Sequence, residues 1–355
     1  MRQAPNGAAR AFSAQQKLDR NNQISDRPRH PSHKRPAIRS RAMPPFRRSA
    51  RRGGTRMAAL AVAVAALSVL PVRAEPLVVS HAQGETALEG VPATVVVTDW
   101  AAFDNLDALG VPVAGVPASA TPPYLADRIG AEVPRVGSLQ EPDIEAIAAA
   151  APDLVVVANR SRASYPILSA LAPTIDATLD NADIVGGVKA SLARYGAIFG
   201  RETRAAELSA ALDAKVAEAR GAAGGRGTGL VVVANGGRLG VYGPGSRVAW
   251  IHDALGVPSP IGAVDDRNHG GDAISFEYLL QVDPDWLFVV DRDAGIGNEG
   301  AARATLDNEL IRTTTFWRRN QIVYLDPAAA YITMHGYSGL MRLLDQVVAG
   351  YRGGT

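Results

Sequence analysis

The chain has 355 residues, a formal charge of +2 at neutral pH and no cysteine. The lack of cysteine excludes structural disulfides, cysteine-ligated zinc, thiol nucleophiles and a lipid-anchoring cysteine. A chain of this length usually exceeds what one hydrophobic core serves, so two domains are expected.

The N-terminal region has the pattern of an export signal. Residues 1–56 are polar and basic, and they lead into the apolar run MAALAVAVAALSVLPV and the small-residue site VRA. We expect cleavage after Ala74, and a start codon as late as Met43 or Met57. Without a cysteine to carry a lipid, the mature protein is expected to be free in the compartment it enters. An N-terminal membrane anchor is the alternative.

The basic residues are concentrated in this signal region. Residues 1–74 hold 16 Lys and Arg against 2 Asp and Glu, which leaves 21 basic and 33 acidic residues and a formal charge of −12 for the remainder. Nucleic-acid binding therefore loses its main support.

In chain order, the first clear elements follow this signal. A short amphipathic helix ends in DALGVP at 107–112, where Gly110 suits a left-handed C-cap. A helix of about two turns then carries Glu145 and precedes PDLVVVANR at 152–160. Its continuous apolar run predicts a parallel strand buried on both faces, with Arg160 at its carboxyl end.

The Ala-rich segment 184–223 has helical periodicity, and Gly200 is its clear interruption. Such a segment predicts a long rigid helix that holds two lobes at a nearly fixed distance. The expected organisation is an extension and signal at 1–74, an N-terminal lobe at 75–183, a connecting helical segment at 184–225 and a C-terminal lobe at 226–355.

The second half repeats the first half's strings in the same order. DALGVP returns at 253–258, and PDWLFVVDR at 284–292 repeats the layout of 152–160, with Glu277 upstream at the interval of Glu145. The repeat predicts an α/β protein of two Rossmann-like lobes, each with a central mostly parallel sheet.

The repeat places one arginine at the same strand exit in each lobe. Ligands of parallel α/β sheets bind beyond the carboxyl ends of the strands, so Arg160 and Arg292 are expected to face a cleft between the lobes. The alternative is that each arginine pairs locally, as Arg292 could with Asp291 or Asp293.

Other side chains could reach such a cleft. Arg247 follows a tight Gly-Pro-Gly loop, His269 lies in a Gly- and Asp-rich loop, and Tyr331 follows a strand and a proline turn. His335 and Tyr337 lie near Tyr331, with weaker support. An exposed histidine and a core tyrosine are the ordinary alternatives. No nucleophile elbow, zinc-protease helix, P-loop or dinucleotide fingerprint is present, so binding is better supported than catalysis.

With these features, the chain resembles the class III periplasmic binding proteins of ABC importers, in the branch that captures ferric catecholate siderophores. The strings that carry the resemblance are HAQGET at 81–86, GPGSR at 243–247, HGGDAIS at 269–275, PDWLFVVDR, and YLDPAAAY at 324–331.

The resemblance implies roles for individual residues. The family's ligand-binding arginines fall on Arg160, Arg247 and Arg292. Its iron-coordinating residues fall on His269 and Tyr331. Its docking carboxylates, which meet the inner-membrane ABC permease dimer, fall on Glu145 and Glu277. The protein is then expected to be a monomer without a permanently bound cofactor, and its ligand an Fe(III)-siderophore complex.

Two other functions remain open at this point. A haem or cobalamin binding protein of the same fold would need a large apolar slot with fewer cations. An exported enzyme would have its active site in the cleft, where His269 and Asp272 could act as base and orienting group.

Overall fold

The computed structural model describes residues 76–246, 248, 250–262, 264 and 271–353. The predicted signal segment, Arg247 and His269 lie outside these residues. Among the helices of the described part, none combines the length and the apolar character needed to cross a membrane.

We call residues 76–183 the N-terminal lobe and residues 226–353 the C-terminal lobe, and we propose these positions as the lobe boundaries. The N-terminal lobe contains β1 Leu77–His81, β2 Gly84–Leu88, β3 Val95–Val97, α1 Trp100–Ala108, α2 Pro123–Ala126, α3 Ile144–Ala149, β4 Leu154–Val157, the 3₁₀ helix η1 Asn159–Ser164, α4 Tyr165–Ser169, β5 Thr174–Asp176 and η2 Asn181–Asp183. The C-terminal lobe contains β6 Gly229–Asn235, β7 Arg238–Tyr242, α7 Trp250–Asp253, β8 Asp272–Ile274, α8 Phe276–Val282, β9 Trp286–Asp291, α9 Arg292–Gly295, α10 Ala302–Leu306, η3 Ile311–Thr313, α11 Thr315–Arg318, β10 Ile322–Tyr324, α12 Pro327–Tyr331 and α13 Tyr337–Tyr351.

The N-terminal sheet has the strand order β3-β4-β5, and all its pairings are parallel. Along β4, Leu154 and Val156 join one core cluster, while Val155 and Val157 join another on the opposite face. All four side chains are fully buried. The prediction that this apolar run is a parallel strand covered on both faces is therefore confirmed.

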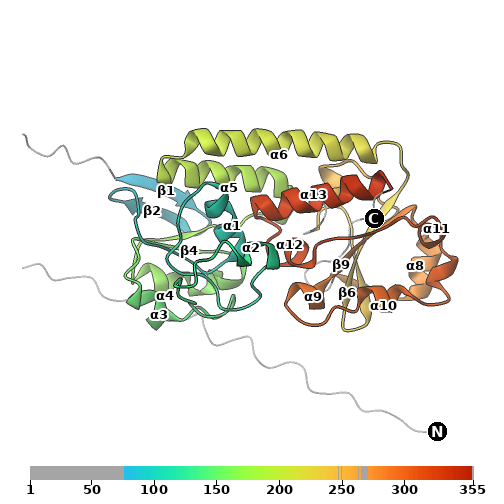
Figure 1. Cartoon of the computed structure of the whole chain (residues 1–355), viewed down its shortest axis with the longest axis horizontal. Coiled ribbons are helices and arrows are strands. Elements are labelled where there is room, and N and C mark those ends of the chain that lie inside the picture. The colour runs from blue at the N-terminus through green and yellow to red at the C-terminus, as the bar shows by residue number, and fades with distance from the viewer. Residues whose placement is uncertain (1–75, 247, 249, 263, 265–270, 354–355) are drawn as a thin grey trace, which may run out of the picture. The chain divides into compact units, whose positions relative to one another are not determined.

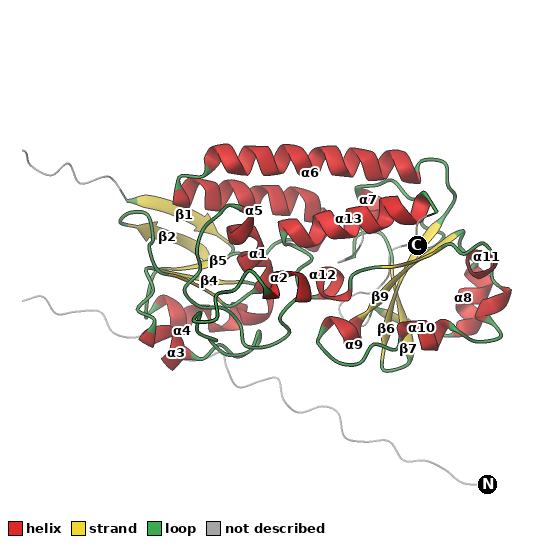
Figure 2. Ribbon diagram, in the orientation of Figure 1, coloured by secondary structure: helices red, strands yellow, loops and turns green. Residues whose placement is uncertain are grey.

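The C-terminal sheet has the strand order β10-β9-β6-β7-β8. β10, β9 and β6 pair in parallel, whereas β7 is antiparallel to both β6 and β8. Of the described strands in this sheet, only β7 therefore opposes the others, and the expectation of a mostly parallel sheet is confirmed (Figure 2).

The sequence repeat is also a structural repeat. Gly110 and Gly256 have φ angles of 72° and 71°, so both are left-handed as predicted. Ala151 and Asp283, each directly before the repeated proline, also have positive φ angles, of 44° and 36°. The same chain reversal thus leads into β4 and into β9.

The repeated Pro-Asp holds the new strand against its neighbour. Asp153 Oδ2 accepts hydrogen bonds from the amides of Ala93 and Thr94, just before β3, at 3.0 and 2.8 Å. Asp285 Oδ2 accepts one from the amide of Thr228, just before β6, at 2.9 Å. A side chain that satisfies main-chain donors at the strand entry explains why Asp follows Pro in both copies.

The connecting segment corrects one expectation, because it forms two helices and not a single one. α5 Ile184–Phe199 ends at Gly200, whose φ of 62° is left-handed, and α6 Glu202–Ala223 follows. α5 packs against α6, and a Cβ at Gly196 would lie 2.9 Å from that of Ala205. The chain thus reverses at Gly200, and α6 alone, about 33 Å long at 1.5 Å per residue, is the long connecting helix.

A second helix crosses the same region. α13 packs beside α6, and it also contacts α1 of the N-terminal lobe and β10 of the C-terminal lobe (Figure 1). One continuous cluster of buried side chains runs through α1, α5, α6, α13 and the covered faces of both sheets. The two lobes are therefore joined by packing as well as by the chain.

Candidate ligand-binding site

Arg160 and Arg292 stand where the repeat predicts them. Arg160 is the second residue of η1, three residues after Val157, the last residue of β4. Arg292 is the first residue of α9, directly after β9. Both lie at the carboxyl end of a parallel strand, the edge at which ligands of such sheets bind.

The structure brings the two arginines together on Tyr331. Arg160 Nη2 donates a hydrogen bond of 3.0 Å to the main-chain oxygen of Tyr331, and Arg292 Nε donates one of 3.0 Å to its hydroxyl oxygen. Both guanidinium carbons also lie over the tyrosine ring, 5.4 and 5.5 Å from its centre. Two half-buried cations from different lobes therefore meet at one aromatic side chain.

Arg292 has further polar contacts in its own lobe. Its Nη1 donates to Asn235 Oδ1 at 3.2 Å and lies 3.6 Å from Asp293 Oδ1. The local pairing considered as an alternative is thus present, but it occupies one terminal nitrogen of the guanidinium group. Asn235, at the end of β6, was not predicted from the sequence, since a lone asparagine at a strand end carries no signal of its own.

Tyr331 is the last residue of α12 and is almost fully buried. α9 and α12 pack closely, because a Cβ at Gly295 would lie 2.8 Å from the main-chain oxygen of Pro327 and 3.2 Å from Cβ of Tyr331. This contact fixes the spacing between the helix that starts with Arg292 and the helix that ends with Tyr331.

Behind Arg160 lies a buried carboxylate. Asp99 caps α1 by accepting hydrogen bonds from the amides of Ala101 and Ala102 at 2.9 and 3.1 Å. Burial raises the pKa of Asp99, and these amides and the charge of Arg160 oppose the rise. The carboxylate and the guanidinium thus influence each other electrostatically.

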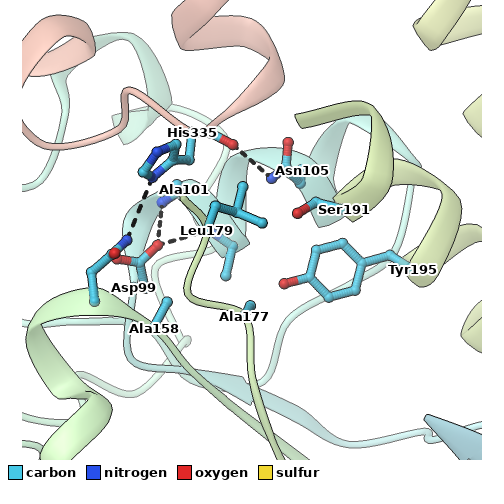
Figure 3. A pocket seen from close by; sticks show the side chains of 11 residues that line it. Asp99, Ala101, Asn105, Ala158, Ala177, Leu179, Ser191, Tyr195 and His335 are labelled. Atoms are coloured by element: carbon cyan, nitrogen blue, oxygen red, sulfur yellow. Dashed lines mark hydrogen bonds between the residues drawn. The ribbon is translucent and has the colours of Figure 1, made fainter. Parts of the chain in front are cut away.

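The residues around Asp99 enclose a cavity (Figure 3). Its volume is about 10 Å³, and its lining includes Asn105, Tyr195 and His335. Such a volume suits a single water molecule and not an organic chelate. This cavity is therefore too small to be the site of such a chelate.

His335 and Tyr337 follow Tyr331 and α12 in the chain. His335 is buried; its main-chain oxygen accepts a 3.0 Å hydrogen bond from Asn105 Nδ2, and its Nδ1 lies 3.5 Å from Asn159 Nδ2. The Tyr337 amide donates to Asn105 Oδ1 at 2.9 Å. Both residues therefore contact the N-terminal lobe, although they belong to the C-terminal lobe in sequence.

Glu145 and Glu277 occupy matched places. Each is the second residue of its helix, α3 or α8, and each side chain is exposed. The pKa of Glu277 is lowered by a hydrogen bond from its own amide and one from the hydroxyl of Ser275. Glu277 therefore stays ionised at neutral pH.

Residues 95–329, more than half of the chain, match the family described as Periplasmic binding protein. The chain belongs to the periplasmic binding protein family. Its fold is that of the class III members, with two α/β lobes and connecting helices.

Three relatives illustrate how far this periplasmic binding protein matches known members of the family. It is 32% identical to the petrobactin-binding protein YclQ of Bacillus subtilis, over 73% of this chain and 82% of YclQ. It is 31% identical to the ferric-anguibactin-binding protein FatB of Vibrio anguillarum, over 81% of this chain and 92% of FatB. The crystal structure of the periplasmic catecholate-siderophore binding protein VctP of Vibrio cholerae superposes with a TM-score of 0.71 and 31% identity, covering 79% of this chain and 100% of VctP.

Proposed function

We propose that this periplasmic binding protein captures a ferric siderophore, of the catecholate type, between its lobes and delivers it to an ABC importer in the inner membrane. The relatives named above support a ferric siderophore as the ligand and binding, not catalysis, as the activity. The iron complex is cargo, and the proposal includes no permanently bound cofactor. We further propose that the mature protein is a monomer, free in the periplasm after cleavage near Ala74.

The observation that carries the proposal is the meeting of Arg160 and Arg292 on Tyr331. Fe(III) held by three catecholate dianions has a net charge of minus three. Guanidinium groups stay charged, are weakly hydrated and donate several hydrogen bonds in one plane, so they suit the oxygens of such a complex. We assign the third cation to Arg247, which lies outside the described residues.

A siderophore with two catecholates leaves two coordination positions of the iron open. We propose that His269 and Tyr331 fill these positions. A histidine nitrogen and a phenolate oxygen are suitable ligands for ferric iron. The bond from Arg292 Nε to the Tyr331 hydroxyl supports this role, because it holds the hydroxyl oxygen 3.0 Å from one of the two arginines proposed to bind the complex.

Delivery requires a surface that the permease recognises. We propose Glu145 and Glu277 as docking carboxylates, one per lobe, for cationic side chains of a two-fold permease. Exposed apolar side chains lie on or beside α8, which carries Glu277: Tyr278 is in the helix, and Leu310 precedes η3, which packs against it. Apolar side chains around a charge are typical of a protein interface.

The test is a titration of the purified mature chain, with its four tryptophans as fluorescent reporters. The ligands are Fe(III) complexes of bidentate, tetradentate and hexadentate catecholates, a hydroxamate, haem and cobalamin. We expect saturable quenching by the ferric catecholates, and its loss in Arg160→Ala and Arg292→Ala. The matched control is Arg312→Ala, which removes an exposed arginine paired with Asp307 in the C-terminal lobe. Quenching by haem or cobalamin alone would show that the protein binds one of these ligands and not a ferric siderophore. No quenching by any ligand would contradict the proposed function.

A further inference from the structure

Tyr331 begins a short segment that the N-terminal lobe holds along its whole length. We call residues 331–339, YITMHGYSG, the crossing segment; it runs from the end of α12 to the first turn of α13. Its contacts with the N-terminal lobe are hydrogen bonds from Arg160 to the Tyr331 oxygen, between Tyr124 and Thr333, from Asn105 to the His335 oxygen, from the Tyr337 amide to Asn105, and from the Ser338 and Gly339 amides to Asp104.

Asp104 is the central anchor of these contacts. Its Oδ1 accepts from the Ser338 amide at 3.2 Å, and its Oδ2 accepts from the Gly339 amide at 2.8 Å and from the Tyr124 hydroxyl at 3.2 Å. The side chain is fully buried. The first amides of a helix lack partners within the helix, and Gly336, the N-cap residue of α13, has no side chain to supply one. A carboxylate of the N-terminal lobe therefore caps a helix of the C-terminal lobe.

The side chain of Asp104 is packed tightly against the crossing segment. A Cβ at Gly336 would lie 2.3 Å from Asp104 Oδ2, and a Cβ at Gly339 would lie 2.7 Å from the Tyr124 hydroxyl. Both distances are below van der Waals contact. Gly336 is therefore needed for the carboxylate to reach the helix amides, and Gly339 leaves room for the Tyr124 hydroxyl that donates to that carboxylate.

The start of the crossing segment and the end of α13 both contact the sheet region of the C-terminal lobe. The ring of Tyr351, the last residue of α13, lies 4.4 Å from that of Trp286 on β9, centre to centre. At the start of the crossing segment, the Tyr331 hydroxyl bonds to Arg292. The segment thus links Arg160 in one lobe with Arg292 in the other, and Asp104 holds it in place between them.

We propose that Asp104 is a positioning residue of the ligand site. By capping α13 from the N-terminal lobe, it sets where Tyr331 stands relative to Arg160 and how far apart Arg160 and Arg292 are held. It does this without touching the ligand. The inference rests on the proposed function, because it concerns the geometry of that same site.

The first variants replace the anchor itself. Asp104→Ala leaves the Ser338 and Gly339 amides without their acceptor, and we expect the affinity for the ferric catecholate to fall by about tenfold or more, as loss of an outer partner of a binding site commonly causes. Asp104→Asn keeps one acceptor oxygen and should restore part of the affinity. The matched control is Thr314→Ala, which removes another buried helix cap, that of α11, elsewhere in the C-terminal lobe. It should lower stability without changing the affinity.

A reciprocal variant reaches the anchor from the opposite side. Gly336→Ala places a methyl group where the Asp104 carboxylate lies, while its φ of −90° remains allowed for alanine. We expect the same loss of affinity. Because both changes break one contact, the double variant Asp104→Ala/Gly336→Ala should lose little more than either single variant. Full additivity would contradict a shared contact between Asp104 and Gly336 and would overturn the inference.

A distance measurement separates positioning from a general loss of stability. The natural chain has no cysteine, so spin labels attach only at cysteines that are introduced. The exposed positions Ala148→Cys on α3 and Gln281→Cys on α8 supply one label site in each lobe. In the unliganded protein, we expect Asp104→Ala to broaden the distance distribution between the lobes and Thr314→Ala to leave it unchanged. If wild type binds the ferric catecholate and Asp104→Ala binds it equally well, the inference is wrong and the proposed function stands. If wild type binds none of the ferric siderophores, both fail.

Discussion

Arg292 and Tyr331 are joined by a 3.0 Å hydrogen bond from Nε to the phenolic oxygen, and the main chain of the same tyrosine accepts a bond of equal length from Arg160. One residue therefore meets a cation from each lobe. A ligand that engages both arginines must come within reach of Tyr331. This relationship makes the tyrosine hydroxyl the most informative atom to remove.

The substitution Tyr331→Phe keeps the ring under both guanidinium groups and deletes the hydroxyl. If this oxygen is an iron ligand, ferric complexes of tetradentate catecholates should lose far more affinity than those of hexadentate ones, whose iron has no open position. Titrations of both complexes check this, with Tyr324→Phe on β10 as the control. Equal losses for the two ligands would argue against direct iron ligation.

The spacing of α9 and α12 predicts a large effect of a small change at Gly295. A methyl group there would lie 2.8 Å from the Pro327 oxygen, so Gly295→Ala should destabilise the fold by about 1–3 kcal/mol and weaken ligand binding together with the Arg292–Tyr331 bond. Denaturant unfolding and the ligand titration measure the two effects. Gly221→Ala in α6 is the control: its Cβ meets no atom within 4 Å, and it should stabilise the helix by about 0.5–1 kcal/mol. An unchanged stability in Gly295→Ala would show that the two helices can move apart freely.

The repeated Asp of the Pro-Asp pair should matter equally in both lobes. Asp153→Ala and Asp285→Ala each remove an acceptor of main-chain amides at a strand entry, and each should cost about 1–2 kcal/mol of unfolding free energy. Denaturant unfolding tests both. Asp213→Ala, which breaks a surface pair with Lys189, should change stability by less than about 1 kcal/mol. Equal effects of all three substitutions would contradict a structural role for the repeat.

Asp104 should give the fold a measurable pH dependence. Burial raises its pKa above the ordinary 3.8, although the contacts with Ser338, Gly339 and Tyr124 oppose the rise. The folded protein thus binds this proton more tightly than the unfolded chain does. The resulting stability is fully present below pH 3.8 and is lost as the pH rises through the folded pKa.

The measurement is the unfolding free energy of wild type and Asp104→Asn across this pH window. The variant cannot titrate at this position, so the wild type should lose stability relative to it as the pH rises. Asp99, whose pKa is also raised by burial, is present in both proteins and cancels in the comparison. A wild type that gains stability relative to the variant would reverse the sign and refute the prediction.

Glu145 and Glu277 should affect docking to the permease and not the binding of the ligand. Glu145→Arg and Glu277→Arg reverse an exposed charge in each lobe, so ligand affinity should stay unchanged while uptake through the permease falls, most of all in the double variant. Uptake of labelled ferric siderophore and ligand titration measure the two steps. Glu202→Arg, at the exposed start of α6, is the control. Normal uptake by the double variant would show that the permease contacts another surface.

The sequence alone determined the elements that depend on local patterns. Buried apolar runs predicted the strands β4 and β9, DALGVP predicted the left-handed glycines Gly110 and Gly256, and the matched Pro-Asp strings predicted two related lobes. These signals are readable because burial on two faces and a positive φ each restrict which residue types fit. The same local logic placed Arg160 and Arg292 at strand exits.

Only the tertiary structure decided how these elements meet. Nothing in the sequence near Gly200 shows that α5 folds back along α6, because the reversal is stabilised by packing between the two helices. Asp104 and Asn105 gave no signal either, since their partners in the crossing segment lie more than 200 positions away in the chain. A hydrogen bond of this range depends on the joint placement of both lobes. Local propensity predicts the strand exits, whereas long-range packing brings two arginines to one tyrosine.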